Sequence, residues 1–251
     1  MTVRDLRGTL YHWRKRALNA WRMRARRTLI LQPCLGGLGD TLFMSHLPRI
    51  AKQTGRCSTV LISSQANYRD PAYRTLVWER NPYVDGFTDA SGLDIVVSPL
   101  PREGCNLLDE YMFLAGLDDG ERFHEPEVHG QFAVDDRWRG AVVYDPNYIT
   151  NAGALTPEMV QAFLAREGVT PTLQLAPRSR SLPLPGVVPT VTTRDVFEFC
   201  SLIVSCERLY CLTTGTATLA AALGKPATVL YGAGVDARFH HSRLHRYVRL
   251  G

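Results

Sequence analysis

The sequence predicts an α/β protein built from two parallel sheets, each wound with helices on both faces. Short β-type runs alternate with helical stretches of about 10–15 residues, and this alternation occurs twice along the chain. A polar stretch at 134–140 separates the two series. Because 251 residues suffice for two compact domains, we expect two Rossmann-like, doubly wound domains at 28–137 and 138–251. A basic helix at 1–27 precedes them.

The N-terminal segment concentrates the positive charge of the chain. Residues 1–27 hold nine basic residues and one acid, so they carry +8, and the remaining residues carry −3 of the total of +5. Within 4–26, apolar residues recur at helical spacing, which predicts an amphipathic helix. They are Leu6, Leu10, Trp13, Ala17 and Trp21. This helix could lie on an anionic membrane surface, or it could pack on the protein's own body with a solvated basic face.

The elements of both series follow from apolar runs and turn residues. In the first series we expect strands at 28–32, 59–63 and 94–98 and a helix at 41–53. In the second we expect strands at 140–144, 172–175, 208–212 and 227–231, and helices at 157–167, 194–205 and 216–223.

Composition excludes several classes of protein. No apolar run approaches the ~20 residues that span a bilayer, and no apolar stretch follows the N-terminal arginines as in a signal peptide. The six cysteines show no metal-binding spacing and predict reduced, structural thiols in the cytosol. His240, His241 and His245 lie in a tail with several arginines and with no acid or cysteine at a ligand spacing, which favours a basic surface or a phosphate contact over a metal site. The acidic body and the lack of a recognisable module argue against nucleic-acid binding.

A glycine-rich turn joins the first strand to the first helix and contains Gly36, Gly37, Gly39 and Asp40. Glycines allow a tight turn and close approach of a ligand to the backbone. The turn is not a dinucleotide fingerprint, because Leu42 occupies the third glycine position and the strand at 60–65 lacks a terminal acid. We therefore expect no nicotinamide or flavin cofactor. Asp40 could be a helix N-cap, or a general base at the carboxyl end of a strand.

A second strand–turn–helix segment is rich in threonine. Its residues Thr213, Thr214, Gly215, Thr216, Ala217 and Thr218 offer hydroxyl and N–H groups at a helix start. Such a turn suits a diphosphate, although capping threonines before a buried Ala-rich helix would give the same pattern. Arg178 and Arg180, in the loop after the strand at 172–175, could contact phosphate or form a solvated loop.

Together these segments resemble glycosyltransferase family 9, the ADP-heptose:lipopolysaccharide heptosyltransferases and their relatives. The family's opening strand, G-x-G-D turn and helix are matched by Gly37-Leu-Gly-Asp40. Its later turn and L-A-A-A-L-G-K-P helix are matched by 213–218 and Leu219-Ala-Ala-Ala-Leu-Gly-Lys-Pro226. Val229-Leu-Tyr-Gly-Ala-Gly234 is similar to the family's strand ending in F-G-P-T. The family's Asp, Pro and His in the second turn correspond to Thr213, Thr216 and Thr218.

The resemblance implies a GT-B fold, in which two Rossmann-like domains face one another across a cleft. The first domain would hold the acceptor, shaped by Gly36, Gly37 and Gly39, and the second would hold a nucleotide diphosphate sugar at 213–218. It implies an inverting hexosyl- or heptosyltransferase that needs no metal or cofactor, with Asp40 as the base. The acceptor would be a cell-envelope glycan or lipid-linked glycan, as in lipopolysaccharide biosynthesis.

Two other functions remain open at this point. The threonines at the family's Asp and His positions would also suit a non-catalytic nucleotide-sugar-binding or regulatory protein of the same fold. The basic helix would suit a membrane-attached interaction module. In each case we expect a cytoplasmic protein, peripheral on the inner face of the cytoplasmic membrane where the helix binds lipid.

Overall fold

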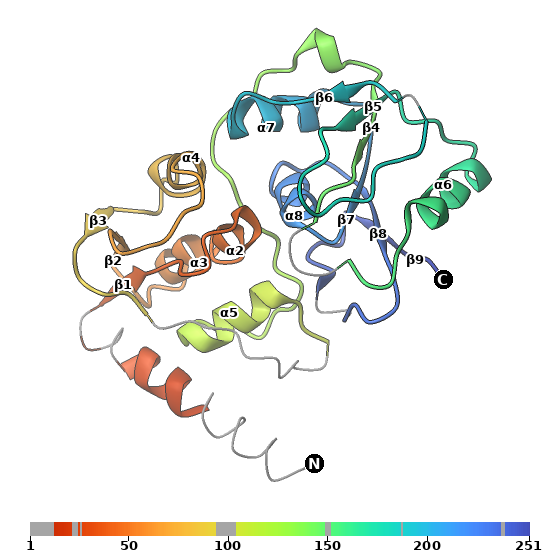
Figure 1. Ribbon diagram of the computed structural model, residues 1–251. Coiled ribbons are helices and arrows are strands. Elements are labelled where there is room, and N and C mark those ends of the chain that lie inside the picture. Colours follow the sequence, from red (N-terminus) through yellow and green to blue (C-terminus); the bar gives the residue numbers. More distant parts are fainter. Residues whose placement is uncertain are drawn as a thin grey trace, which may run out of the picture. The chain divides into compact units, whose positions relative to one another are not determined.

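The computed structural model describes residues 13–21, 25, 27–93, 104–148, 152–186, 188–236 and 239–251. The chain divides into two compact units, Met1–His129 and Gly130–Gly251 (Figure 1). The polar stretch at 134–140 lies inside the second unit, because it is bound to helix α7 (Val196–Ser205). The backbone N–H of Asp135 donates to Ser205 Oγ over 2.8 Å, and Arg137 pairs with Glu198 at 2.8 Å.

The sheet of the first unit is parallel and has the order β1–β2–β3. Strands β1 (Thr28–Leu31) and β2 (Thr59–Ser63) lie where the sequence predicts them, and β3 (Gly86–Thr88) was not predicted. The predicted strand at 94–98 lies outside the described residues. The chain nevertheless passes β1 again just before it, because Leu93 N–H donates to the carbonyl of Ile30 over 2.7 Å.

The helices of the first unit differ from the prediction at two places. The predicted helix at 41–53 is wrong: α2 (Leu38–Leu42) and α3 (Leu47–Gln53) are separate. Pro48 has no N–H to donate to the preceding turn, which disfavours a continuous helix here and suits the first turn of α3. Helix α5 (Leu107–Ala115) was missed, because all of its residues are buried and its sequence has no alternation of polar and apolar faces. The remaining elements are α4 (Ala72–Arg74) and the π-helix η1 (Thr75–Glu79).

Residues 13–21 form a helix that contacts the end of α5. Asn19 Nδ2 donates to the carbonyl of Leu114 over 2.9 Å, and Ala20 lies where a side chain on Gly116 would project. Trp13 is half exposed and its ring also contacts the Phe113 ring of α5, with 5.1 Å between the ring centres, whereas Trp21 of the predicted apolar stripe is exposed. Residues 13–21 thus contact the protein's own body, which is one of the two alternatives that the sequence leaves open. Binding of this helix to a membrane surface stays a prediction.

The second unit has a six-stranded parallel sheet with the order β6–β5–β4–β7–β8–β9 (Figure 1). Its strands are β4 (Val142–Asp145), β5 (Leu173–Leu175), β6 (Thr190–Val191), β7 (Arg208–Leu212), β8 (Thr228–Tyr231) and β9 (Arg246–Arg249). From β4 the chain builds outward to β6, and then returns beside β4 and builds outward to β9 on the other side. This is the doubly wound order that the alternation predicts.

Helices of the second unit cover this sheet and hold its strand ends in place. Besides α7 they are α6 (Pro157–Arg166), α8 (Gly215–Ala222) and the short 3-10 helix η2 (Asp136–Trp138). Val160, Phe163 and Leu164 of α6 share a buried cluster with Tyr144 and Leu212 of the two central strands. The α/β architecture with parallel sheets is thus confirmed. Within the described part of the chain, no helix is long and apolar enough to cross a membrane.

Candidate ligand sites at the strand ends

The glycine-rich turn of the first unit leads from β1 into α2. Gly36 has a φ of +76°, a left-handed conformation that favours glycine. Gly37 is the N-cap residue, and Asp40 is the third residue of the helix, so the interpretation of Asp40 as the N-cap is wrong. Its carboxylate instead reaches back to accept the N–H of Gly37 over 3.2 Å, occupying the space that a side chain on Gly37 would need.

The loop after β2 holds this turn in position. Gly36 forms a parallel bridge with Tyr68, and the N–H of Arg69 donates to the carbonyl of Gly36 over 2.9 Å. The N–H of Asn67 donates to the carbonyl of Pro33 over 2.8 Å. The turn is therefore built from the ends of two adjacent parallel strands, which is where doubly wound sheets bind ligands.

Burial and neighbouring charges set the protonation of Asp40. Burial raises its pKa, and this effect exceeds the opposing effects of the Gly37 N–H and of the Arg69 guanidinium. Burial raises the pKa of Tyr111 of α5, and the nearby charge of Asp40 raises it further. A carboxylate with a raised pKa at a strand end can accept a proton more readily than an ordinary aspartate.

In the second unit, the central strands β4 and β7 end side by side. Asp145, the last residue of β4, is in register with Cys211 of β7, and its side chain is buried. Its carboxylate accepts the Thr216 hydroxyl over 2.5 Å and the backbone and side-chain N–H groups of Asn147 over 3.0 and 2.8 Å. Burial raises the pKa of Asp145 despite these hydrogen bonds. This carboxylate joins the loop after β4 to the start of α8.

Asn147 extends the connection to the loop after β5. Its Nδ2 donates to the carbonyl of Ala176 over 3.2 Å, and its Oδ1 accepts the N–H of Arg178 over 2.7 Å. The N–H of Tyr148 donates to the carbonyl of Arg180 over 3.1 Å. The structure therefore brings Arg178 and Arg180, whose side chains are exposed, to the same edge of the sheet as the threonine turn.

The threonine hydroxyls in this turn are bound within the protein. Thr214 is the N-cap of α8 and accepts the N–H of Thr216 over 3.3 Å, while the Thr216 hydroxyl binds Asp145. The side chain of Thr218 is fully buried and lies 3.1 Å from His241 Nδ1, and Ala217 is buried as well. The first turn of α8 can therefore offer an anion its backbone N–H groups, but not the hydroxyls of Thr216 and Thr218.

Two of the C-terminal histidines pack against helix α8. His241 and His245 are buried, and His245 Nε2 lies 2.8 Å from the carbonyl of Ala217. His245 Nδ1 accepts the N–H of Ala227 over 3.2 Å. The interpretation of these histidines as a basic surface is therefore wrong for His241 and His245. Burial lowers the pKa of His241 to about 3, so this ring is neutral.

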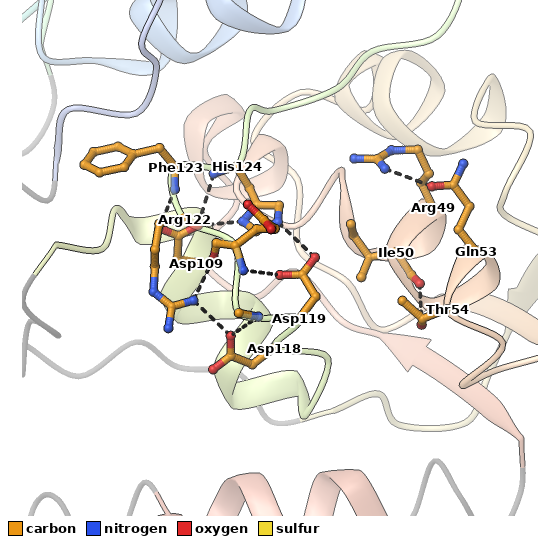
Figure 2. A network of polar contacts seen from close by, with 12 residues as sticks. Arg49, Ile50, Gln53, Thr54, Asp109, Asp118, Asp119, Arg122, Phe123 and His124 are labelled. Carbon is orange, nitrogen blue, oxygen red and sulfur yellow. Dashed lines mark hydrogen bonds and ion pairs between the residues drawn. The ribbon is translucent and has the colours of Figure 1, made fainter.

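A further cluster of titratable side chains in the first unit connects α5 to the segment that follows it (Figure 2). The buried carboxylate of Asp109 accepts the N–H groups of Asn106, Phe123 and His124, and also His124 Nδ1 at 2.6 Å. On the other side of the ring, His124 Nε2 lies 3.3 Å from Asp119. Among the described residues, no group of three or more His, Cys, Asp or Glu side chains could hold a metal ion.

Solved structures resemble this chain in fold at low sequence identity. A glycosyl transferase family 9 protein from Veillonella parvula superposes with a TM-score of 0.58 and 11% identity, over 89% of this chain and 85% of that one. ADP-heptose LPS heptosyltransferase II of E. coli superposes with a TM-score of 0.57 and 14% identity, over 88% of this chain and 89% of that one. The dodecameric iron-containing glycosyltransferase TibC of enterotoxigenic E. coli superposes with a TM-score of 0.56 and 16% identity, over 88% of this chain and 62% of that one. No protein-family model and no curated protein sequence matches.

The chain has the glycosyltransferase family 9 fold. The resemblance predicted from two short motifs is thereby confirmed for the fold. The sequence predicted Asp40 and the threonine turn as site residues, but not Arg69, Tyr111, Asp145 and Asn147, which the structure places beside them. The sequence contained a signal for two of these, since Asp145 and Asn147 lie within three residues of the end of a predicted strand.

Asp145 allows a direct test of how the candidate site in the second unit is held together. Replacing Asp145 with Ala leaves the Thr216 hydroxyl and the Asn147 amide without their partner, and we expect a loss of about 2–4 kcal/mol in the free energy of unfolding. Asp145→Asn keeps hydrogen-bonding groups at both positions and should cost less than about 1 kcal/mol.

The pH dependence gives a second measure of the same carboxyl group. Because its pKa is raised in the folded state, wild-type stability should fall as the pH rises above 3.8 toward the folded pKa. Asp145→Asn should lack that decline in urea unfolding followed from about pH 4 to pH 7. Equal pH profiles for wild type and Asp145→Asn would contradict the assignment.

Proposed function

We propose that the protein is a metal-independent, inverting glycosyltransferase that uses a nucleotide diphosphate sugar. The main support is the place where β4 and β7 end side by side, since this is where the strand order of the second sheet reverses. Doubly wound sheets bind nucleotides at such switch points, beside a helix N-terminus that favours phosphate. The strand ends are joined there through Asp145, Asn147 and Thr216.

The donor diphosphate would lie against the start of α8 at Thr213, Thr214 and Gly215. The helix dipole and the backbone N–H groups of the first turn favour the negative charge that develops as the nucleotide leaves. The guanidinium groups of Arg178 and Arg180 would add two positive charges from the neighbouring loop. The buried Thr216, Ala217 and Thr218 would support this turn, because the N–H of Thr216 is bound by Thr214 and its hydroxyl by Asp145.

Asp40 would serve as the general base in the first unit, with Gly36, Gly37 and Gly39 shaping the acceptor side. It would take the proton of the acceptor hydroxyl while that oxygen forms a bond to the anomeric carbon. The bond between that carbon and the diphosphate oxygen breaks in the same step, so the nucleoside diphosphate leaves and the configuration inverts. The raised pKa of Asp40 supports this role.

The acceptor would be a cell-envelope glycan or lipid-linked glycan, and the protein would act in the cytoplasm at the inner face of the cytoplasmic membrane. One of the similar structures is named as an ADP-heptose LPS heptosyltransferase, which supports a hexosyl or heptosyl donor and an acceptor of this kind. The +8 charge of residues 1–27 supports a position beside anionic lipid.

Thermal unfolding in the presence of ADP-, UDP- and GDP-sugars tests the donor site. A ligand that binds the folded state at a hundred times its Kd should stabilise the protein by about 2.7 kcal/mol. Arg178→Ala together with Arg180→Ala should weaken that binding. The control is Arg208→Ala, because Arg208 is an exposed arginine at the opposite, amino-terminal end of β7. Absence of stabilisation by every nucleotide sugar, or equal loss in the control, would contradict the proposed donor site.

A non-catalytic nucleotide-sugar-binding protein is the second candidate function. The observation that favours it is the inward orientation of the Thr216 and Thr218 hydroxyls, which leaves fewer polar groups at the turn for catalysis. Binding of a nucleotide sugar in calorimetry without turnover on any acceptor, lipid-linked glycans included, would favour this candidate over the enzyme.

A further inference from the structure

One side of the N-terminal helix exposes large apolar side chains. Trp13 is 53% exposed, Leu18 45% and Trp21 66%, and Ala17 is exposed between them. At 100° per residue these four positions fall within one arc of about 140° on the helix. We call this arc the Trp13–Trp21 face. Arg14, which is also exposed, lies within it.

The opposite side of the helix is already bound to the protein. Lys15 and Asn19 are buried there, and Asn19 Nδ2 donates to the carbonyl of Leu114. At the edge of the contact, the Arg16 guanidinium lies 4.5 Å from the centre of the Phe113 ring. The Trp13 ring is perpendicular to the Phe113 ring, with 5.1 Å between the two ring centres. These contacts fix the rotation of the helix, so the Trp13–Trp21 face is exposed, with only Trp13, at its edge, also contacting the first unit.

The positive charge of residues 1–27 favours a membrane over a second copy of the chain as the partner of this face. A second copy of the chain would bring another segment of +8 against this one, and the like charges would repel. A bilayer rich in anionic lipid offers an apolar interior for tryptophan and leucine and negative headgroups for arginine. We propose that the Trp13–Trp21 face inserts into the interface of an anionic membrane. This deepens the peripheral location proposed above, but it does not depend on sugar transfer.

Tryptophan fluorescence of the full chain can follow this binding. The chain has four tryptophans, and Trp78 and Trp138 are buried in the two units. A blue shift on adding vesicles therefore reports Trp13 and Trp21, and quenching by brominated lipid would place them in the interface. We expect the shift with equimolar phosphatidylcholine and phosphatidylglycerol, and little shift with phosphatidylcholine alone. About 0.5 M NaCl should weaken the binding at least tenfold.

Variants of the Trp13–Trp21 face distinguish insertion of its apolar side chains from binding of the lipid by charge alone. Trp13→Ser, Leu18→Ser and Trp21→Ser together should weaken co-sedimentation with the mixed vesicles by about 10- to 100-fold. The matched control is Val134→Ser with Leu244→Ser, which removes two exposed apolar side chains of the second unit and should bind like wild type. Asp40→Asn should also bind vesicles like wild type, whether or not the protein transfers sugar.

Three results would overturn the proposal. The first is a triple variant that binds as tightly as wild type. The second is wild-type binding that ignores both lipid charge and salt. The third is a wild-type dimer in sedimentation equilibrium that the triple variant dissociates, because the face would then be occupied by a second copy.

Discussion

Asp40→Asn is expected to lower the rate of sugar transfer by about 10²–10⁴-fold, because asparagine cannot accept the proton of the acceptor hydroxyl. The side chain keeps its size and can still accept the N–H of Gly37, so the turn should retain its conformation. Affinity for the nucleotide sugar should stay unchanged, since the proposed donor residues lie in the second unit. The measurement is kcat for transfer to an acceptor, with donor affinity determined separately.

Asp70→Asn is the matched control for that substitution. Asp70 lies next to Arg69 in the loop that holds the glycine turn, and its carboxylate accepts the N–H of Ala72 over 2.9 Å, which asparagine can also do. We expect transfer at the wild-type rate. The raised pKa of Asp40 adds a pH test, because wild-type kcat/KM should fall as the pH decreases through that pKa, which lies above 3.8. Full transfer by Asp40→Asn would exclude Asp40 as the base.

Asp109→Ala is expected to destabilise the first unit by about 3–5 kcal/mol, the typical loss when one partner of a buried ion pair is removed. The Asp109 side chain is 1% exposed, and its carboxylate ties α5 to the backbone of Phe123 and His124 (Figure 2). Without it, three N–H groups and the His124 ring lose their acceptor. Urea unfolding at neutral pH measures the loss.

Asp119→Ala provides the control for Asp109. Asp119 lies farther from the His124 ring, at 3.3 Å, and its side chain is 23% exposed, so its loss should cost less than about 1 kcal/mol. Equal losses for the two variants would show that the buried carboxylate does not hold this segment.

The same ion pair predicts a pH optimum for the stability of the first unit. Burial raises the pKa of Asp109, but the hydrogen bonds from His124 and from three backbone N–H groups bring it below 3.8. Its contribution is therefore lost as the pH falls through that lowered value. Asp109 raises the pKa of His124 above 6.5, so the contribution of His124 is lost as the pH rises through the raised value. His124→Gln should remove the alkaline decline but not the acidic one.

The sequence predicted elements whose pattern is local and missed those that depend on the rest of the molecule. Strands β1, β2 and β7 were found because each is a run of apolar residues bounded by turn residues. Helix α5 was missed because it is buried on all sides, although Asn106 and Asp109 form a capping box that marks its start. Strands β3 and β6 are too short to give a pattern.

The same distinction applies to the two candidate sites. Asp40 and the threonine turn were predicted as site residues because glycines and threonines cluster within a few residues of a strand end. Asp145 was not predicted as a site residue, because its contact with Thr216 forms only when β4 lies beside β7. Thr216 is 71 residues away in the sequence. Likewise, the burial of His241 against α8 depends on the chain returning to this helix after β8.

The strand order of the second unit has a consequence for how the protein folds during synthesis. β4 is made first, but its neighbour β7 and the turn that follows it emerge more than sixty residues later. The histidines that support α8 emerge later still, between β8 and β9. Pairings between such distant segments form slowly, because a long loop must close before any contact compensates for the lost entropy. The candidate donor site is therefore one of the last parts of the molecule to form, and a nascent chain cannot bind its ligand until the sheet is almost complete.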